Sequence, residues 1–187
     1  MDGVRIHYSR FLTIPSPLPL RSANQPRFYI GVRCTQDIQK GQFVDRYFGE
    51  VITAKAADRR RKLSDIARKK DVYLFALDKF HDPDSLDPRL SQPPLLVDGE
   101  FMSGPTRFIN HSCAPNLRIY ARVGDHADKH LHDLALFAIA DIPKNTELTF
   151  DYIDGVEDEE EDLSNPATLK EMTKCLCGSP NCRGFLW

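Results

Sequence analysis

The chain has 187 residues, of which 41% are hydrophobic and 28% charged, as is typical of a globular domain large enough for one hydrophobic core. The formal net charge of -2 excludes a global positive field, so we expect no sequence-specific nucleic-acid binding. No apolar run approaches the roughly 18 residues of a membrane span, and the polar start lacks a signal-peptide core, so we expect an intracellular protein without membrane association.

The first predicted elements follow a proline-containing segment. Residues 1–26 are expected to form an extended or disordered arm, because their prolines fix φ and remove backbone donors. The residue patterns of 28–34 and 42–47 predict two strands. Thr53 suits a helix N-cap, and residues 54–70 after it have high helix propensity and no glycine or proline.

One stretch of this predicted helix is strongly basic, Arg59-Arg60-Arg61-Lys62. Such a run is found in nucleic-acid-binding and nuclear-import patches, and also on solvated helix faces. We favour the solvated face, because a single charge run is weak evidence for a partner.

The second half of the chain predicts mostly short strands. Residues 71–80 predict a strand buried on both faces, and the proline-rich residues 81–94 predict a surface loop. Gly104-Pro105 opens a helical turn expected to carry residues 107–112. Further strands are predicted at 95–98, 116–123, 133–140 and 147–150, followed by an acidic linker at 153–170. One long helix among many short strands indicates a mainly β fold with short helices, and not a βαβ series.

Thiols gather near the C-terminus. Cys175, Cys177 and Cys182 place three soft ligands within eight residues. A structural Zn²⁺ takes four ligands in a tetrahedron, and Cys34 and Cys113 remain in the chain. We therefore expect a zinc site, the alternative being a set of unrelated free thiols.

A second candidate metal site is the polar loop that holds His126, His130 and His132. Three histidines within seven residues could bind a metal, but the loop has no thiol. We favour a loop in which the histidines serve solubility alone.

Two further stretches combine unusual side chains, Arg107-Phe108-Ile109-Asn110-His111-Ser112-Cys113 and Glu147-Leu148-Thr149-Phe150-Asp151-Tyr152. An amide beside an imidazole suits a purine edge and an amino-acid zwitterion, and it also suits capping residues at the end of a turn. Together with the C-terminal thiols, and in the same order, these stretches resemble the SET-domain protein lysine methyltransferases. The likeness is strongest to the fungal members that methylate histone H3 at lysine nine, and it runs from about Gly31 to Trp187.

The resemblance implies the SET fold, in which small curved sheets surround a pseudoknot, with a C-terminal zinc-binding post-SET tail. The SET domain would occupy 27–152 and the tail 171–187. The resemblance makes Cys113 the fourth zinc ligand beside Cys175, Cys177 and Cys182. A cysteine-rich pre-SET region usually lies upstream in these enzymes, whereas no cysteine precedes Cys34 here. A fragment, a divergent gene product and an enzyme in decline would all fit.

The same resemblance implies an S-adenosylmethionine site. Its residues would be Tyr29, Ile30, Gly31, Tyr73, Arg107, Asn110, His111 and Leu176. One part departs from the family, which has Gly-x-Gly where this chain has Tyr29-Ile30-Gly31. The Tyr29 side chain would obstruct the cofactor or force another backbone path.

The substrate implied by the resemblance is the histone H3 tail in chromatin, which places the protein in the nucleus on the chromosome. The lysine channel would be lined by Tyr47, Phe75, Phe150, Tyr152 and Trp187. Tyr152 would be the central catalytic residue, with Tyr47 beside it. The tail would bind as an added strand, with Asp78 attracting a basic residue of the peptide.

The residue two positions before Tyr152 is expected to set the product. Phe150 leaves an apolar space where a tyrosine would anchor a water, so the resemblance implies di- and trimethylation. Core packing alone is the simpler interpretation of Phe150. A catalytically weak chromatin-binding module and a zinc-stapled structural domain are the alternatives to an enzyme.

Overall fold

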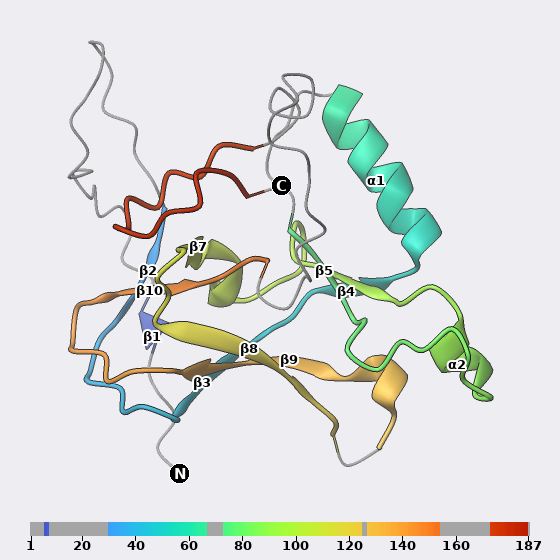
Figure 1. Cartoon of the computed structure of the whole chain (residues 1–187), viewed down its shortest axis with the longest axis horizontal. Coiled ribbons are helices and arrows are strands. Elements are labelled where there is room, and N and C mark those ends of the chain that lie inside the picture. Colours follow the sequence, from blue (N-terminus) through green and yellow to red (C-terminus); the bar gives the residue numbers. More distant parts are fainter. Residues whose placement is uncertain (1–5, 8–29, 67–72, 125–126, 154–172, 187) are drawn as a thin grey trace. The chain divides into compact units, whose positions relative to one another are not determined.

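The computed structural model describes residues 6–7, 30–66, 73–124, 127–153 and 173–186 (Figure 1). The chain divides into two compact units. Unit 1 contains Gly41–Phe108 and Ile119–Phe137, and unit 2 contains Arg5–Lys40, Ile109–Arg118 and Ala138–Trp187. Within the described part of the chain, no helix combines the length and the apolar character that a membrane span requires.

A three-stranded antiparallel sheet forms the first part of unit 1. Its order is β4 (Glu50–Ile52), β6 (Leu96–Asp98), β5 (Leu74–Ala76), so β5 lies at an edge. The helix α1 (Ala54–Ile66) follows β4 directly and packs its Ala57 into a cluster with Ile52 and Leu96. Burial of these apolar side chains holds the helix against the sheet.

The N-terminus of α1 is capped as predicted. The Thr53 hydroxyl accepts a hydrogen bond from the Ala56 N–H at 3.3 Å. One member of the basic run, however, is not merely solvated. Arg60 donates to the carboxylate of Asp98, which is only 3% exposed, at 2.5 Å, and to that of Glu50 at 2.8 Å. Arg60 therefore joins the helix to the sheet, and the solvated-face prediction applies to the exposed Arg59, Arg61 and Lys62.

A second strand group completes the sheets of unit 1. β3 (Phe43–Tyr47) pairs antiparallel with β9 (Asp133–Ala138), and β9 neighbours β8 (Leu117–Arg122). The buried cluster of this unit joins Tyr47, Leu77, Val97 and Leu134. Three short helical segments lie in its connections: α2 (Pro88–Ser91), η1 (Pro105–Phe108) and η2 (Lys129–Leu131).

Unit 2 is organised around β10 (Glu147–Phe150). This strand pairs antiparallel with β2 (Val32–Cys34) and parallel with β7 (Asn110–His111). Phe150 of β10 also pairs with Leu117, the first residue of β8. The fully buried Cys34 donates its S–H to the Pro143 carbonyl, at a distance of 3.1 Å. β10, which holds the first four residues of the stretch 147–152, therefore lies at the centre of a hydrogen-bonded sheet.

The predicted fold class is confirmed, while several predicted boundaries are wrong. Of the strand expected at 71–80, the described residues 73–80 contain only β5, whose residues are half-buried because β5 is an edge strand. The helical turn ends at Phe108, and Asn110 and His111 form β7 instead. The predicted loop 81–94 contains α2, which begins at an Asp87 N-cap. β4 was not predicted. Of the predicted arm 1–26, only β1 (Ile6–His7) is described; it is extended and pairs with β2.

Candidate functional site

Unit 2 contains a compact group of metal-ligand side chains. One ligand atom each of His111, Cys113, Cys175 and Cys177 lies within 4.8 Å of the others, the only such group found among the described residues. The sulfurs of Cys113 and Cys175 are 3.8 Å apart. The tail is closed into a loop by hydrogen bonds from Cys175 N to Gly184 O and from Leu186 N to Thr173 O. Three converging thiols fit the donor set that Zn²⁺ prefers in structural sites.

Cys182 was predicted to bind zinc together with Cys113, Cys175 and Cys177, but the structure groups His111 with the other three thiols. The Tyr152 N–H donates to Nδ1 of His111 at 3.2 Å, so a neutral imidazole carries its hydrogen on Nε2. That nitrogen lies 3.3 Å from the Cys113 sulfur and is placed to donate to it rather than to bind a metal. The Cys182 sulfur accepts a hydrogen bond from the Gly184 N–H at 3.4 Å, and Cys182 stays a predicted ligand.

The pKa values of the side chains in this cluster are shifted in different directions. Burial raises the pKa of Cys113 and of Cys175. Burial also acts to raise the pKa of Cys177, but hydrogen bonds from the Cys113 backbone and from Ser179 outweigh it and lower the pKa to about 6. Burial lowers the pKa of His111, against the opposing Asp151 carboxylate, so the ring is neutral at pH 7.

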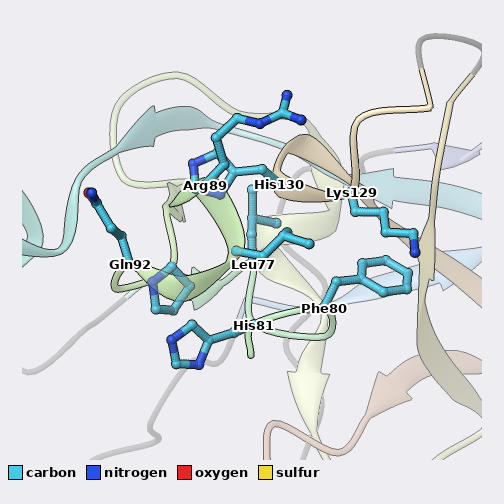
Figure 2. A pocket seen from close by; sticks show the side chains of 9 residues that line it. Leu77, Phe80, His81, Arg89, Gln92, Lys129 and His130 are labelled. Carbon is cyan, nitrogen blue, oxygen red and sulfur yellow. The ribbon is translucent and has the colours of Figure 1, made fainter. Parts of the chain in front are cut away.

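The described histidines of the polar loop, His130 and His132, form no comparable group. His126 lies outside the described residues. The ring of His132 is buried, with Nδ1 2.8 Å from the Lys129 carbonyl and its edge against Phe80 at 5.2 Å. Figure 2 shows His130 on the lining of a shallow pocket that also contains Arg89 and Lys129, whose charges oppose a metal cation. These contacts support the interpretation without a metal.

Asn110 connects two other predicted cofactor residues. Its amide nitrogen Nδ2 donates to the Ile30 carbonyl at 3.1 Å and to Oε1 of Glu147 at 2.9 Å. A Cβ on Gly31 would lie 2.6 Å from that Glu147 oxygen and 3.0 Å from Nδ2, so a side chain at 31 would have to displace the Glu147–Asn110 contact. Ile30 is 65% exposed and Leu176 50% exposed, so both leave apolar surface accessible to a ligand.

Tyr152 is held by its neighbours in unit 2. Its hydroxyl donates to the Ile109 carbonyl at 2.7 Å, and its ring lies 4.8 Å from Phe150 and 5.3 Å from His111. The adjacent Asp151 accepts from Arg183 of the tail at 2.6 Å. The thiol-bearing tail is thereby fastened beside the tyrosine.

Tyr47, Tyr73, Phe75 and Arg107 lie in unit 1. The Tyr47 hydroxyl donates to the Tyr73 carbonyl at 2.9 Å, and its ring meets Phe75 edge-on at 4.6 Å. The guanidinium of Arg107 lies over the Tyr73 ring at 4.2 Å and donates to the Glu100 carbonyl. Its buried Nε has no acceptor among the described residues.

The structure therefore gathers the predicted residues into two separate sets. In unit 2 it brings together Ile30, Gly31, Asn110, His111, Phe150 and Tyr152, and in unit 1 Tyr47, Tyr73, Phe75 and Arg107. Asp78 is exposed just beyond the end of β5. Tyr29 and Trp187 lie outside the described residues. The sequence analysis missed Glu147 as a partner of Asn110. Alternation along β10 was the available signal, because it places the Glu147 side chain on the same face as Thr149 and on the face opposite to Phe150.

The family model described as "SET domain" matches residues 30–153. Among curated proteins, the chain is 70% identical over 157 residues to "Histone-lysine N-methyltransferase, H3 lysine-9 specific dim-5" of Neurospora crassa, covering 84% of this chain and 47% of that protein. It is 65% identical over 170 residues to "Histone-lysine N-methyltransferase, H3 lysine-9 specific KMT1" of Fusarium mangiferae, covering 91% of this chain and 49% of that protein. The chain thus spans about half the length of these relatives.

Solved structures give the same result. The structure described as "Structure of the Neurospora SET domain protein DIM-5, a histone lysine methyltransferase" matches with a TM-score of 0.62 at 68% identity, covering 79% of this chain and 52% of that one. "Structural basis for the product specificity of histone lysine methyltransferases" matches with a TM-score of 0.68 at 64% identity, covering 84% and 52%. The fold, the family model and the identity to these proteins agree, and the chain belongs to the SET-domain family.

Proposed function

We propose that the protein is an S-adenosylmethionine-dependent protein-lysine N-methyltransferase that acts on lysine nine of the histone H3 tail. The observation that carries the proposal is the 70% identity, over 157 residues, to a relative named for that activity. The proposed location is the nucleus, on the chromosome, and the proposed partners are the H3 tail and chromatin. The domain limits proposed are 27–152 for the SET domain and 171–187 for the post-SET tail.

The proposed cofactor residues retain unused hydrogen-bonding groups. No described residue donates to Oδ1 of Asn110, and the buried Nε of Arg107 has no acceptor among the described residues. An acceptor and a donor of this kind suit the amino-acid part of S-adenosylmethionine, and the exposed Ile30 and Leu176 suit its apolar surface. The bound cofactor supplies a methyl group on a sulfonium. We assign Tyr29, Gly31, Tyr73 and His111 to the same site.

The proposed catalytic residues share one hydrogen-bond pattern. The hydroxyls of Tyr152 and Tyr47 each donate to a main-chain carbonyl, so each phenol oxygen presents lone pairs as acceptor. An amine that donates its N–H to such an oxygen has its lone pair directed away from it. Orientation of a nucleophile in this way can contribute several kcal/mol, up to about 7–11 in well-aligned cases.

The lysine must also be neutral to attack. We assign the aromatic side chains of Phe75, Phe150 and Trp187, with the two tyrosines, to a channel that desolvates the amine. Desolvation disfavours the ammonium form and lowers a lysine pKa. The same ring faces favour a methylated ammonium by cation–π attraction, which accommodates higher methylation states.

We assign peptide binding to β5. It is the edge strand of the β4-β6-β5 sheet, and an edge strand offers backbone groups to an added strand. Asp78, exposed beyond the end of β5, supplies a carboxylate for a basic residue of the tail. Zinc bound by Cys113, Cys175, Cys177 and Cys182 would hold the tail closed.

A second candidate function is a chromatin-binding module that has lost most of its activity. The observation in its favour is Tyr29-Ile30 at a position where the family has glycine and an aromatic residue. Tyr29→Gly distinguishes the two. Much tighter S-adenosylmethionine binding in the variant favours the module, and an unchanged dissociation constant favours the enzyme.

The proposed function is tested by calorimetric titration with S-adenosylmethionine, followed by mass spectrometry of an H3 tail peptide. We expect saturable binding and di- and trimethylated lysine nine. Tyr152→Phe should keep cofactor binding and lose methyl transfer by about 100-fold or more, because the amine loses its acceptor. Cofactor binding without any methylated peptide would contradict the assignment as an enzyme.

A further inference from the structure

The carboxylate of Glu147 has no role in the proposed reaction, yet it lies against the proposed cofactor residues. Oε1 accepts from Nδ2 of Asn110 at 2.9 Å, and the same nitrogen donates to the Ile30 carbonyl at 3.1 Å. Parallel pairing of β10 with β7 holds the backbones of the two residues near each other, with Thr149 opposite Asn110. The pairing of β7 with β10 therefore supports the contact between Asn110 and Glu147.

These two contacts determine which way the Asn110 amide faces. A carboxylate and a main-chain carbonyl both only accept hydrogen bonds, so the atom that faces them must be the amide nitrogen. An amide nitrogen has two hydrogens, and both are used. The carbonyl oxygen Oδ1 is the remaining polar atom of the amide, and no described residue donates to it.

We propose that Glu147 is a positioning residue that fixes Asn110 with Oδ1 presented to the ligand, so that the site accepts a hydrogen bond from a nitrogen donor of the cofactor. The inference rests on the proposed use of S-adenosylmethionine. Without an acceptor at 147, only the Ile30 carbonyl still holds the nitrogen, so the amide rotates more readily to present that nitrogen, which repels an N–H or ammonium group. Glu147 thereby sets the ligand's donor–acceptor preference without touching the ligand.

The same carboxylate also constrains the neighbouring loop. A Cβ on Gly31 would come within 2.6 Å of Oε1, so a side chain at 31 would displace the Glu147 carboxylate from its present position. We expect Gly31→Ala to weaken cofactor binding in the natural chain and to do so much less in a Glu147→Ala background. Two independent positions would give additive effects in this double-mutant cycle.

The main test uses the zinc-loaded full chain and calorimetric titration with S-adenosylmethionine and with S-adenosylhomocysteine. Glu147→Leu removes the acceptor, and about tenfold weaker binding of both ligands is expected. Glu147→Gln keeps an acceptor oxygen and should bind within about twofold of the natural chain. The matched control is Asn116→Ala. Among the described residues, the Asn116 side chain bonds to main-chain groups of β10, the Glu147 carbonyl at 2.8 Å and the Thr149 N–H at 2.9 Å, so its loss should lower Tm with little change in affinity.

A second measurement needs no variant. In the ligand-free protein the side-chain amide protons of Asn110 should exchange with solvent more slowly than those of the exposed Asn145. Equal exchange rates would overturn the inference, as would a Glu147→Leu variant that binds like the natural chain, or equal losses in Glu147→Leu and Glu147→Gln. Failure of the natural chain to bind either ligand refutes the proposed function instead.

Discussion

The two units hold their candidate residues by different means. In unit 1, Tyr47 and Phe75 sit on an apolar cluster with Leu77 and Leu134, and the buried Asp98 is neutralised by Arg60. In unit 2, Phe150 and Tyr152 lie beside a cluster of thiols whose sulfurs approach within 3.8 Å. Apolar packing is complete without any added group, whereas clustered thiols are favourable only when a metal binds the thiolates. We therefore expect unit 2 to depend on zinc and unit 1 not to.

The variant with the largest expected effect on this difference is Cys175→Ser. Apparent binding free energies of structural zinc reach the order of 10 kcal/mol, so the variant should lose its zinc and the closed tail. Elemental analysis and hydrogen exchange should show zinc loss with protection lost around 173–186 and kept in β4, β6 and α1. Cys34→Ala is the control, since Cys34 bonds to the Pro143 carbonyl and not to the cluster. A variant that retains full zinc content would refute the site.

The corresponding test of unit 1 is a substitution of Arg60. Arg60→Met leaves the Asp98 carboxylate buried without its cation, which should cost about 3 kcal/mol in free energy of unfolding. Denaturant titration measures it, and Arg59→Met, on the exposed side of α1, should change stability by less than about 0.5 kcal/mol. Zinc content should be unchanged in both variants. Equal stabilities would mean that Arg60 is only a solvated charge.

Phe150→Tyr tests whether the aromatic pair of unit 2 does more than pack. Phe150 is 2% exposed, so a new hydroxyl there costs about 1–3 kcal/mol if it finds no partner. A hydroxyl that binds a water near the amine should stop the reaction at monomethyl-lysine in a folded enzyme. Mass spectrometry at long reaction times separates this from packing alone, which predicts lower stability with the same products. A natural chain that stops at one methyl group contradicts the proposed product.

The smallest expected effect concerns the edge strand of unit 1. Asp78→Ala should weaken H3 peptide binding by about two- to fivefold at low salt, the size of one exposed ion pair, and have no effect at high salt. Asp84→Ala, exposed in the following loop, is the matched control. Peptide affinity that stays the same at low salt would remove Asp78 from the proposed peptide site.

The sequence predicted the fold class and most strands because their apolar alternation is local. It placed β10 and β6 almost correctly, since both are short and central. It extended β5 too far, because periodicity does not distinguish a central strand from an edge. The cysteine spacing predicted that Cys175 and Cys177 lie together, and the family resemblance added Cys113. The contact of His111 with Cys113 depends on which ring nitrogen faces the sulfur. Glu147 and Arg60 were missed because their roles come from partners 37 and 38 residues away along the chain.

Cys34 gives the molecule an internal chemical reporter. Its side chain is fully buried and its hydrogen is committed to Pro143, while the other four cysteines all lie in or beside the predicted zinc site. Alkylation of the zinc-loaded protein should therefore be slow at every thiol. A chelator should expose four alkylation sites, and the fifth should react only at the rate of global unfolding. Mass spectrometry that counts alkylated cysteines over time would therefore measure the rate of metal release and the rate of unfolding separately in a single sample.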